Sequence, residues 1–189
     1  LSATNTALVF NVPTINLNGT QVSNGTADQT YNGSVTFGAS QTLDAANITF
    51  QNGTTTFDGV NVTIDVTGAA TSDAGNHLDF QDGDLILANG SSFVSNGTAE
   101  YRLGTGFFEF RGTGTFTNNG TFNHSAAGNS DNLELFDSFT FQNNGTYDFQ
   151  ERGDIRLRGT STFNNAGLVV KSVAGTDQSF IFGLSTDGD

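Results

Sequence analysis

The sequence predicts an all-β fold built as a solenoid of short, stacked strands. Its 189 residues include 24 Gly and 18 Phe, but only 1 Pro and no Cys, Met or Trp. Few segments of such a chain would hold a helix. Asn, Thr, Ser and Gly separate short runs of Phe, Val, Ile and Leu, which is typical of many short strands joined by turns. One phrase also recurs at a fixed period, and a fixed period indicates stacked repeats.

The repeated phrase aligns four segments without gaps: Leu85–Phe93, Phe108–Phe116, Leu133–Phe141 and Ile155–Phe163. Their last residues, Phe93, Phe116, Phe141 and Phe163, give a period of roughly 22 to 25 residues, within the range of solenoid repeats. The repeats are clearest over residues 83–171. A chain of this length is expected to form a single domain, residues 1–189.

Each unit is expected to contain three strands. The first alternates apolar and charged residues, as at 108–110, 133–135 and 155–157, so that the apolar side chains point inward. The second ends at the repeated Phe, and we expect these four Phe side chains to stack as the structural core. Asn-Gly then marks a tight corner, where we expect positive φ. The third strand, for example 146–149, leaves that corner.

An antiparallel sandwich is the alternative fold, because Asn-Gly between apolar runs is also the strongest hairpin signal. The gap-free matches favour the solenoid. No single rung would bury its own apolar face, so stability has to come from neighbouring rungs. We therefore expect open edges that associate end to end with further copies or with flanking repeats, and a chain that is a fragment or subunit of a longer fibre.

A second phrase occupies residues 28–50, DQTYNGSVTFGASQTLDAANITF. It resembles the repeats of large secreted bacterial exoproteins related to filamentous haemagglutinin, in which a Q-x-Y-N-G-x-V-T segment leads to a T-L segment and then to N-I/V-T-F. We therefore describe residues 1–65 as an exoprotein-like segment. The resemblance implies a single-stranded right-handed parallel β-helix that forms the shaft of an adhesin on the bacterial cell surface or released from it.

The charge balance restricts the partners. With 19 acidic and 6 basic residues, the formal net charge is −13. A nucleic-acid partner is not expected for such an acidic chain. No apolar stretch is long enough for a membrane-spanning helix, so membrane insertion is not expected either. Absence of cysteine excludes a disulfide framework. A cell-surface or glycan receptor is left as a possible partner.

Two short motifs are candidate sites. Asp79, Asp82 and Asp84 surround Gly83 in an oxygen-rich segment of the kind that Ca²⁺ favours, although the spacing of an EF-hand is missing. A solvated acidic turn is the simpler interpretation, and no other cofactor is expected. Arg152-Gly153-Asp154 is the cell-attachment tripeptide recognised by integrins, and it would have to be exposed to act.

Catalysis has little support in the sequence, and we expect no enzyme. His77 and His124 are the only histidines, and neither stands in a metal-ligand spacing. We predict a structural or adhesive shaft module of a secreted bacterial surface protein, acting in adhesion, biofilm or fibre formation. The alternatives are a carbohydrate-active β-helix enzyme, a polysaccharide lyase or hydrolase with acidic and basic residues along a groove, and an ice-binding solenoid with a Thr ladder at 113, 115, 160 and 162.

Overall fold

The computed structural model describes residues 6–23, 25–102, 108–125, 132–151, 153–172, 179 and 181–183. It is a parallel β-solenoid of about 7 turns, which confirms the predicted fold class and excludes the antiparallel sandwich. All strand pairings are parallel in the part of the chain described, and no element there is a helix long and apolar enough to cross a membrane. The one helical turn there is the 3₁₀ segment η1 (Ala88–Gly90).

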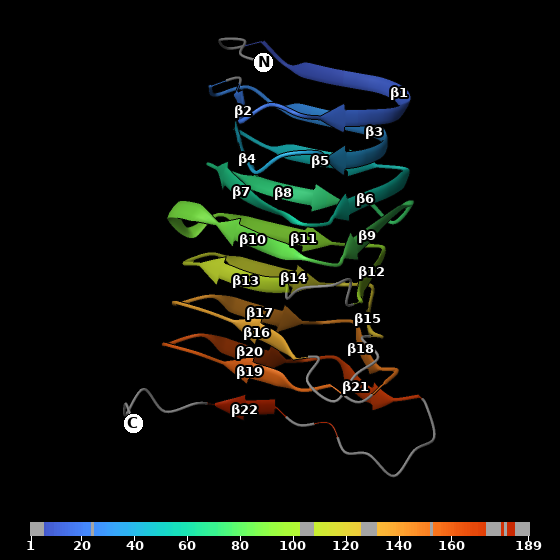
Figure 1. The fold of residues 1–189 in the computed structure, drawn as a ribbon, viewed down its shortest axis with the longest axis vertical. Helices are drawn as coiled ribbons and strands as arrows, with labels where there is room; N and C mark the ends of the chain where they lie inside the picture. Colours follow the sequence, from blue (N-terminus) through green and yellow to red (C-terminus); the bar gives the residue numbers. More distant parts are fainter. Residues whose placement is uncertain are drawn as a thin grey trace.

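Each turn has three strands, which form three faces along the solenoid (Figure 1). The first face is an eight-stranded sheet of β2 (Gln21–Ser23), β4 (Gln41–Ala45), β7 (Val60–Val66), β10 (Gly83–Leu87), β13 (Phe108–Gly112), β16 (Leu133–Leu135), β19 (Ile155–Leu157) and β22 (Ile181–Gly183). The second face contains β5 (Ile48–Gln51), β8 (Ala69–Ser72), β11 (Ser92–Ser95), β14 (Thr115–Asn118), β17 (Thr140–Asn143) and β20 (Thr162–Asn165).

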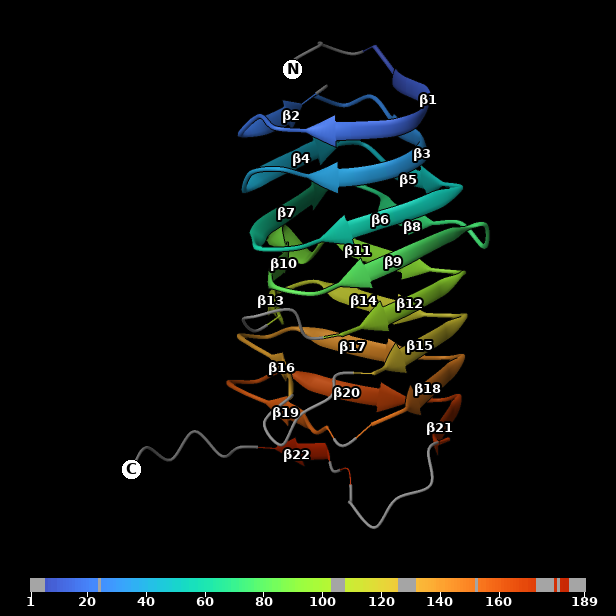
Figure 2. The ribbon, with the colours of Figure 1, turned by 45° about the vertical axis from the view of Figure 1, so that its right-hand side comes forward.

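The third face contains β6 (Gly53–Phe57), β9 (Asn76–Phe80), β12 (Thr98–Tyr101), β15 (Thr121–His124), β18 (Thr146–Phe149) and β21 (Leu168–Lys171) (Figure 2). Two long strands, β1 (Leu8–Leu17) and β3 (Gln29–Phe37), run through the corner between the second and third faces and contribute to both. Viewed from the N-terminal end, the chain turns clockwise as it moves away, so the coil is right-handed.

The repeat length varies slightly more than the sequence predicts. Gln41 pairs with Val62, 21 residues later, whereas Ile155 pairs with Ile181, 26 residues later. The ladders stay in register except in β1, where a bulge between Asn11 and Thr14 shifts the pairing with β3 by one residue. Register is maintained because a shift by one residue would turn every inward side chain toward solvent.

The repeated Phe side chains form a column along the second face. Phe93, Phe116 and Phe141 are fully buried, and Phe163 in the last turn is partly buried against the same core. Neighbouring ring centroids lie 5.5, 5.1 and 5.3 Å apart along this series. Aromatic rings at this separation interact favourably beyond the area that they bury.

The Asn-Gly corners follow a different rule from the one we predicted. Positive φ occurs at Asn52-Gly53, but Gly97, Gly120 and Gly145 are not among the described residues with positive φ, so that prediction is wrong at these three corners. The reason is close approach between turns. A Cβ on Gly145 would lie 2.1 Å from the backbone oxygen of Gly120, and one on Gly120 would lie 1.9 Å from that of Gly97. Only glycine fits where backbones approach so closely.

The asparagines at these corners form two hydrogen-bonded ladders. On the outside, Asn144 Nδ2 donates to Asn119 Oδ1 at 3.1 Å, and Asn119 Nδ2 donates to Asn96 Oδ1 at 3.0 Å. On the inside, Asn118 Nδ2 donates to Asn143 Oδ1 at 2.7 Å, and Asn143 in turn donates to Asn165 at 2.6 Å. Each residue of the Asn-Asn-Gly phrase therefore bonds to, or fits against, its own copies in neighbouring turns.

Candidate functional site: a charged ladder on the first face

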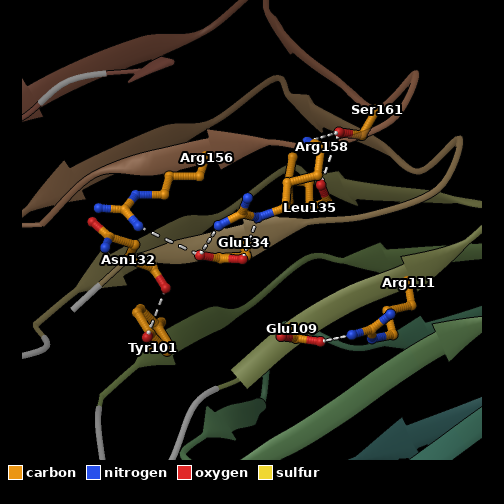
Figure 3. A network of polar contacts seen from close by, with 9 residues as sticks. All are labelled: Tyr101, Glu109, Arg111, Asn132, Glu134, Leu135, Arg156, Arg158 and Ser161. Carbon is orange, nitrogen blue, oxygen red and sulfur yellow. Dashed lines mark hydrogen bonds and ion pairs between the residues drawn. The ribbon is translucent and has the colours of Figure 1, made fainter. Parts of the chain in front are cut away.

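The outward side of the first face gathers charged side chains in its C-terminal half. The strand pairings align Asp84 with Glu109, Glu109 with Glu134, and Glu134 with Arg156 in one column. Arg111 lies two residues after Glu109 in β13. Arg158 lies two residues after Arg156, just beyond the end of β19. We call this set, together with Phe136, the charged ladder; Figure 3 shows most of its members. It contains three of the six basic residues of the chain.

The arginines of the charged ladder are paired with its carboxylates. Arg158 donates from Nε and Nη2 to the two oxygens of Glu134, at 2.6 and 2.9 Å (Figure 3). The Nη1 atom of Arg156 lies 3.7 Å from Glu134 Oε1. Arg111 forms an ion pair with Glu109, and its Nε lies 3.5 Å from Asp84 Oδ2. Two-point contacts of this kind fix the orientation of a guanidinium as well as its charge.

Phe136 lies between two of these arginines. The guanidinium carbon of Arg111 is 4.2 Å from the ring centroid, and that of Arg158 is 5.5 Å from it. Cations over an aromatic face are attracted by the ring quadrupole. The aligned sequence segments contained the signal for this contact, because the fourth residue of consecutive units is Arg111, Phe136 and Arg158. We missed it because the ring interrupts a charged column.

The surroundings of the ladder shift the pKa of several of its groups. Burial raises the pKa of the Glu109 carboxyl, and the nearby charges of Asp84 and Glu134 raise it further, although Arg111 opposes both effects. Burial also raises the pKa of Asp84. The hydrogen bond to Glu134 raises the pKa of Arg158. The charges balance within the ladder, so it is a local structural feature of the face and offers no surplus charge to a ligand.

The structure does not bring the three candidate calcium ligands together. Asp79 points outward from the third face and accepts hydrogen bonds at 2.7 and 2.6 Å from Arg102, whereas Asp84 belongs to the charged ladder. Asp82 is buried at the intervening corner, where its backbone oxygen accepts from Gly59. Among the residues that the structure describes, no group of three or more His, Asp or Glu side chains is placed to hold a metal ion.

Asp79 is held in its charged form by these contacts. Burial alone would raise the pKa of its carboxyl, but the hydrogen bonds from Arg102 and Gln81, together with the charges of Arg102 and His77, hold that pKa below its usual value. Arginine is an effective partner here because its guanidinium reaches both carboxylate oxygens.

The cell-attachment tripeptide is described only in part. Arg152 lies outside the described residues, Gly153 is buried and Asp154 is half-buried. The backbone oxygen of Asp154 accepts a hydrogen bond from Leu133 at 2.9 Å. Two of the three residues therefore belong to a turn that packs against the preceding rung.

The two histidines and the hydroxyl columns lie elsewhere. His124 is fully buried, with Nδ1 2.9 Å from the Tyr147 hydroxyl, and His77 lies 3.7 Å from Glu100 on the third face. On the second face, Thr115, Thr140 and Thr162 align outward, and Thr162 donates to Thr140 at 3.2 Å. The next outward column contains Thr117, Gln142 and Asn164, so its hydroxyl series is interrupted.

Comparisons with protein-family models, with curated proteins and with solved structures return no match to this chain. The fold and its repeated ladders define a β-solenoid repeat protein. Its resemblance to secreted exoproteins stays a prediction based on residues 28–50.

Proposed function

We propose that this chain is a shaft module of a secreted bacterial surface protein, which holds other segments away from the cell in adhesion, biofilm or fibre formation. The observation that carries the proposal is the uninterrupted ladder of the second face, in which each strand from β3 to β20 pairs with the next along the axis. Stability summed over such nearest-neighbour contacts gives an extended, quasi-one-dimensional body.

The core supports a mechanical role. Inward side chains from all three faces form one continuous apolar cluster from Ile15 to Ile155, with Phe163 and Val169 packed against its end. Close-packed interiors have low compressibility and transmit strain. A pull along the axis would therefore be distributed over the backbone hydrogen bonds and the stacked rings of many turns.

The stiffness of the solenoid can be measured with spin labels on introduced cysteines, because the chain contains no cysteine of its own. Thr30 and Asn164 lie in the same outward column, six strand spacings apart, or about 29 Å at the usual parallel spacing. Spin labels on a Thr30→Cys, Asn164→Cys variant, diluted with unlabelled chain, should give a single narrow distance distribution near that value. A broad distribution, of the kind that a flexible linker gives, would refute the shaft proposal.

Adhesion is tested separately by displaying the chain on a non-adherent bacterium. Cells that carry the folded chain should adhere to surfaces, or to one another, more than cells that carry Phe141→Asp, which unfolds because a charge enters the buried ring column. Equal adherence by both displays would mean that the folded shaft does not contribute, and adhesion would have to be dropped from the proposal.

A further inference from the structure

The large exposed apolar side chains of the described residues lie in end strands, where Val9 and Leu168 point outward from the sides and Ile181 stands in an inward column. The large hydrophobic residues exposed in the described part of the chain are Val9 (66%), Val12 (49%), Leu168 (55%) and Ile181 (44%). Val9 and Val12 belong to β1, Leu168 to β21 and Ile181 to β22, which are terminal strands of their faces (Figure 1). The turns between them cover their apolar side chains.

Charge is distributed in the opposite way. Residues 1–27 contain no Asp, Glu, Lys or Arg, and neither do residues 159–170, although the chain as a whole has a net charge of −13. The sides of the intermediate turns carry the acidic residues, among them Asp44 and Asp65, which align on the first face, and Glu100 on the third. Natural sheets commonly protect their edge strands with charges. The end strands of this chain carry few charges: β1 and β20 have none and β21 ends at Lys171, although β1 contains Pro13 and a bulge.

The two edges share the same columns, although β1 contains one extra residue, because its register shifts between Asn11 and Thr14 at a bulge that includes Pro13. From Leu8 to Ile15 the chain advances seven residues, whereas from Phe163 to Val169 it advances six. Following the successive pairings, Leu8 occupies the column of Phe163, and Ile15 occupies that of Val169. The same register sets Phe10 against Asn165. The solenoid already contains a pair of this kind, an aromatic residue beside a polar one, because Phe50 pairs with Ser72 in that column.

From these observations we propose that copies of this chain stack head to tail, with the β1 edge of one copy on the β20–β21 edge of the next. The proposal rests on the proposed shaft function and names its partner as a second copy of the chain. Both edges run in the same direction, so stacking continues the parallel ladder and the right-handed coil. Such a heterologous contact does not close on itself, and it gives filaments. Repulsion between the acidic sides disfavours lateral association.

The hydrogen-bonding direction of each edge residue suggests the blocking variants. Leu8 N–H donates to the backbone oxygen of Asp28, just before β3, so alternation along a parallel strand directs the Val9 N–H to the open edge. At the other end, Thr162 N–H donates back to Phe139, and the same alternation directs the Asn165 N–H to the open edge. Val9→Pro and Asn165→Pro therefore each remove one edge donor and leave the backbone N–H groups that bond within the copy in place. Asn165→Pro also removes the side-chain amide that bonds to Asn143 and Gly167, as does its control Asn165→Ser.

The experiment is sedimentation velocity and negative-stain electron microscopy over a concentration series. The unchanged chain should form filaments that lengthen with concentration. Each proline variant alone should remain monomeric at concentrations about tenfold above those at which the unchanged chain assembles, because the substitution removes an N–H that faces the open edge. A mixture of the two variants should form dimers and nothing longer, since each contributes one intact edge.

Matched controls keep the edge N–H. Val9→Thr and Asn165→Ser should assemble like the unchanged chain. Serine is chosen for position 165 because it already stands at positions 72 and 95 of the same column. A chain that stays monomeric at every concentration, prolines without effect, or a mixture without dimers would each overturn head-to-tail stacking. A narrow distance distribution in the spin-label experiment would still support the shaft in any of these cases, so the two proposals fail separately.

Discussion

The N-terminal and C-terminal halves of the second face build the same interior with opposite arrangements. In the C-terminal half, the first inward column contains Phe93, Phe116, Phe141 and Phe163, and the second contains Ser95, Asn118, Asn143 and Asn165. In the N-terminal half, the first column contains Gln29, Ile48 and Ala70, and the aromatic rings Phe10, Tyr31 and Phe50 stand in the second.

The exchange occurs over one turn of small residues. Ala70 and Ser72 lie between the two arrangements, and across them the Phe50 and Phe93 rings still stack, with centroids 6.0 Å apart. In both halves, therefore, one of the two inward columns is largely aromatic and the other contains mainly polar or small residues. Cores tolerate such rearrangement when total volume and patterning are kept.

The largest expected effect tests whether the two ring columns are equivalent. Phe116→Ala in the C-terminal half and Phe50→Ala in the N-terminal half should each lower the free energy of unfolding by about 3–5 kcal/mol, because both rings are fully buried. Urea denaturation followed by circular dichroism measures both. A cost at Phe50 several times smaller than at Phe116 would mean that the halves are not equivalent.

Corner glycines sharpen the comparison, since Gly53 has φ of 76° whereas Gly145 does not have positive φ. Gly145→Ala should cost about 1–3 kcal/mol, because the new methyl group meets the Gly120 oxygen. The control is Gly90→Ala, where φ is 76° and nothing lies within 4 Å of a Cβ, so that only backbone strain of about 1 kcal/mol is expected. If Gly145→Ala were neutral in thermal melting, close approach would not explain that corner.

Among the residues that the structure describes, the buried ladder of asparagine amides lies in the C-terminal half. Asn118→Ala removes donors to Asn143 Oδ1 and to the Thr146 backbone oxygen, and should cost about 1–3 kcal/mol. Asn119→Ala, in the exposed ladder beside it, should change stability by no more than about 0.5 kcal/mol. Similar costs for the two variants in chemical denaturation would show that burial of the inner ladder is not decisive.

The smallest expected effect lies on the first face. Because folding raises the Asp84 pKa, the folded state binds its proton more tightly than the unfolded state, and this contribution to stability is lost as pH rises through the folded-state pKa. Asp84→Asn should therefore stabilise the protein at pH 7. The gain should be less than about 1 kcal/mol, because the Asp84 carboxylate is partly exposed and solvent screens its charge. The difference should disappear below the ordinary Asp pKa. Destabilisation at pH 7 would instead mean that the ion pair with Arg111 dominates.

The repeated phrases by themselves determined the three-strand turn, its inward residues and the parallel stack. These follow from local alternation and from a period that brings identical residues together, and both can be read from one chain. The column of Arg111, Phe136 and Arg158 was equally present in the aligned segments, although its cation–π contact was not recognised there.

Tertiary structure alone decided why Asn-Gly stands at the later corners and where the acidic residues point. Gly145 is required by the distance to the backbone of the preceding turn, which no local φ preference encodes. Asp79 and Asp84 are near in sequence but belong to different faces, because the corner at Asp82 turns the chain between them. Contacts across turns depend on how neighbouring rungs are placed, and that placement is fixed only when the whole ladder has formed.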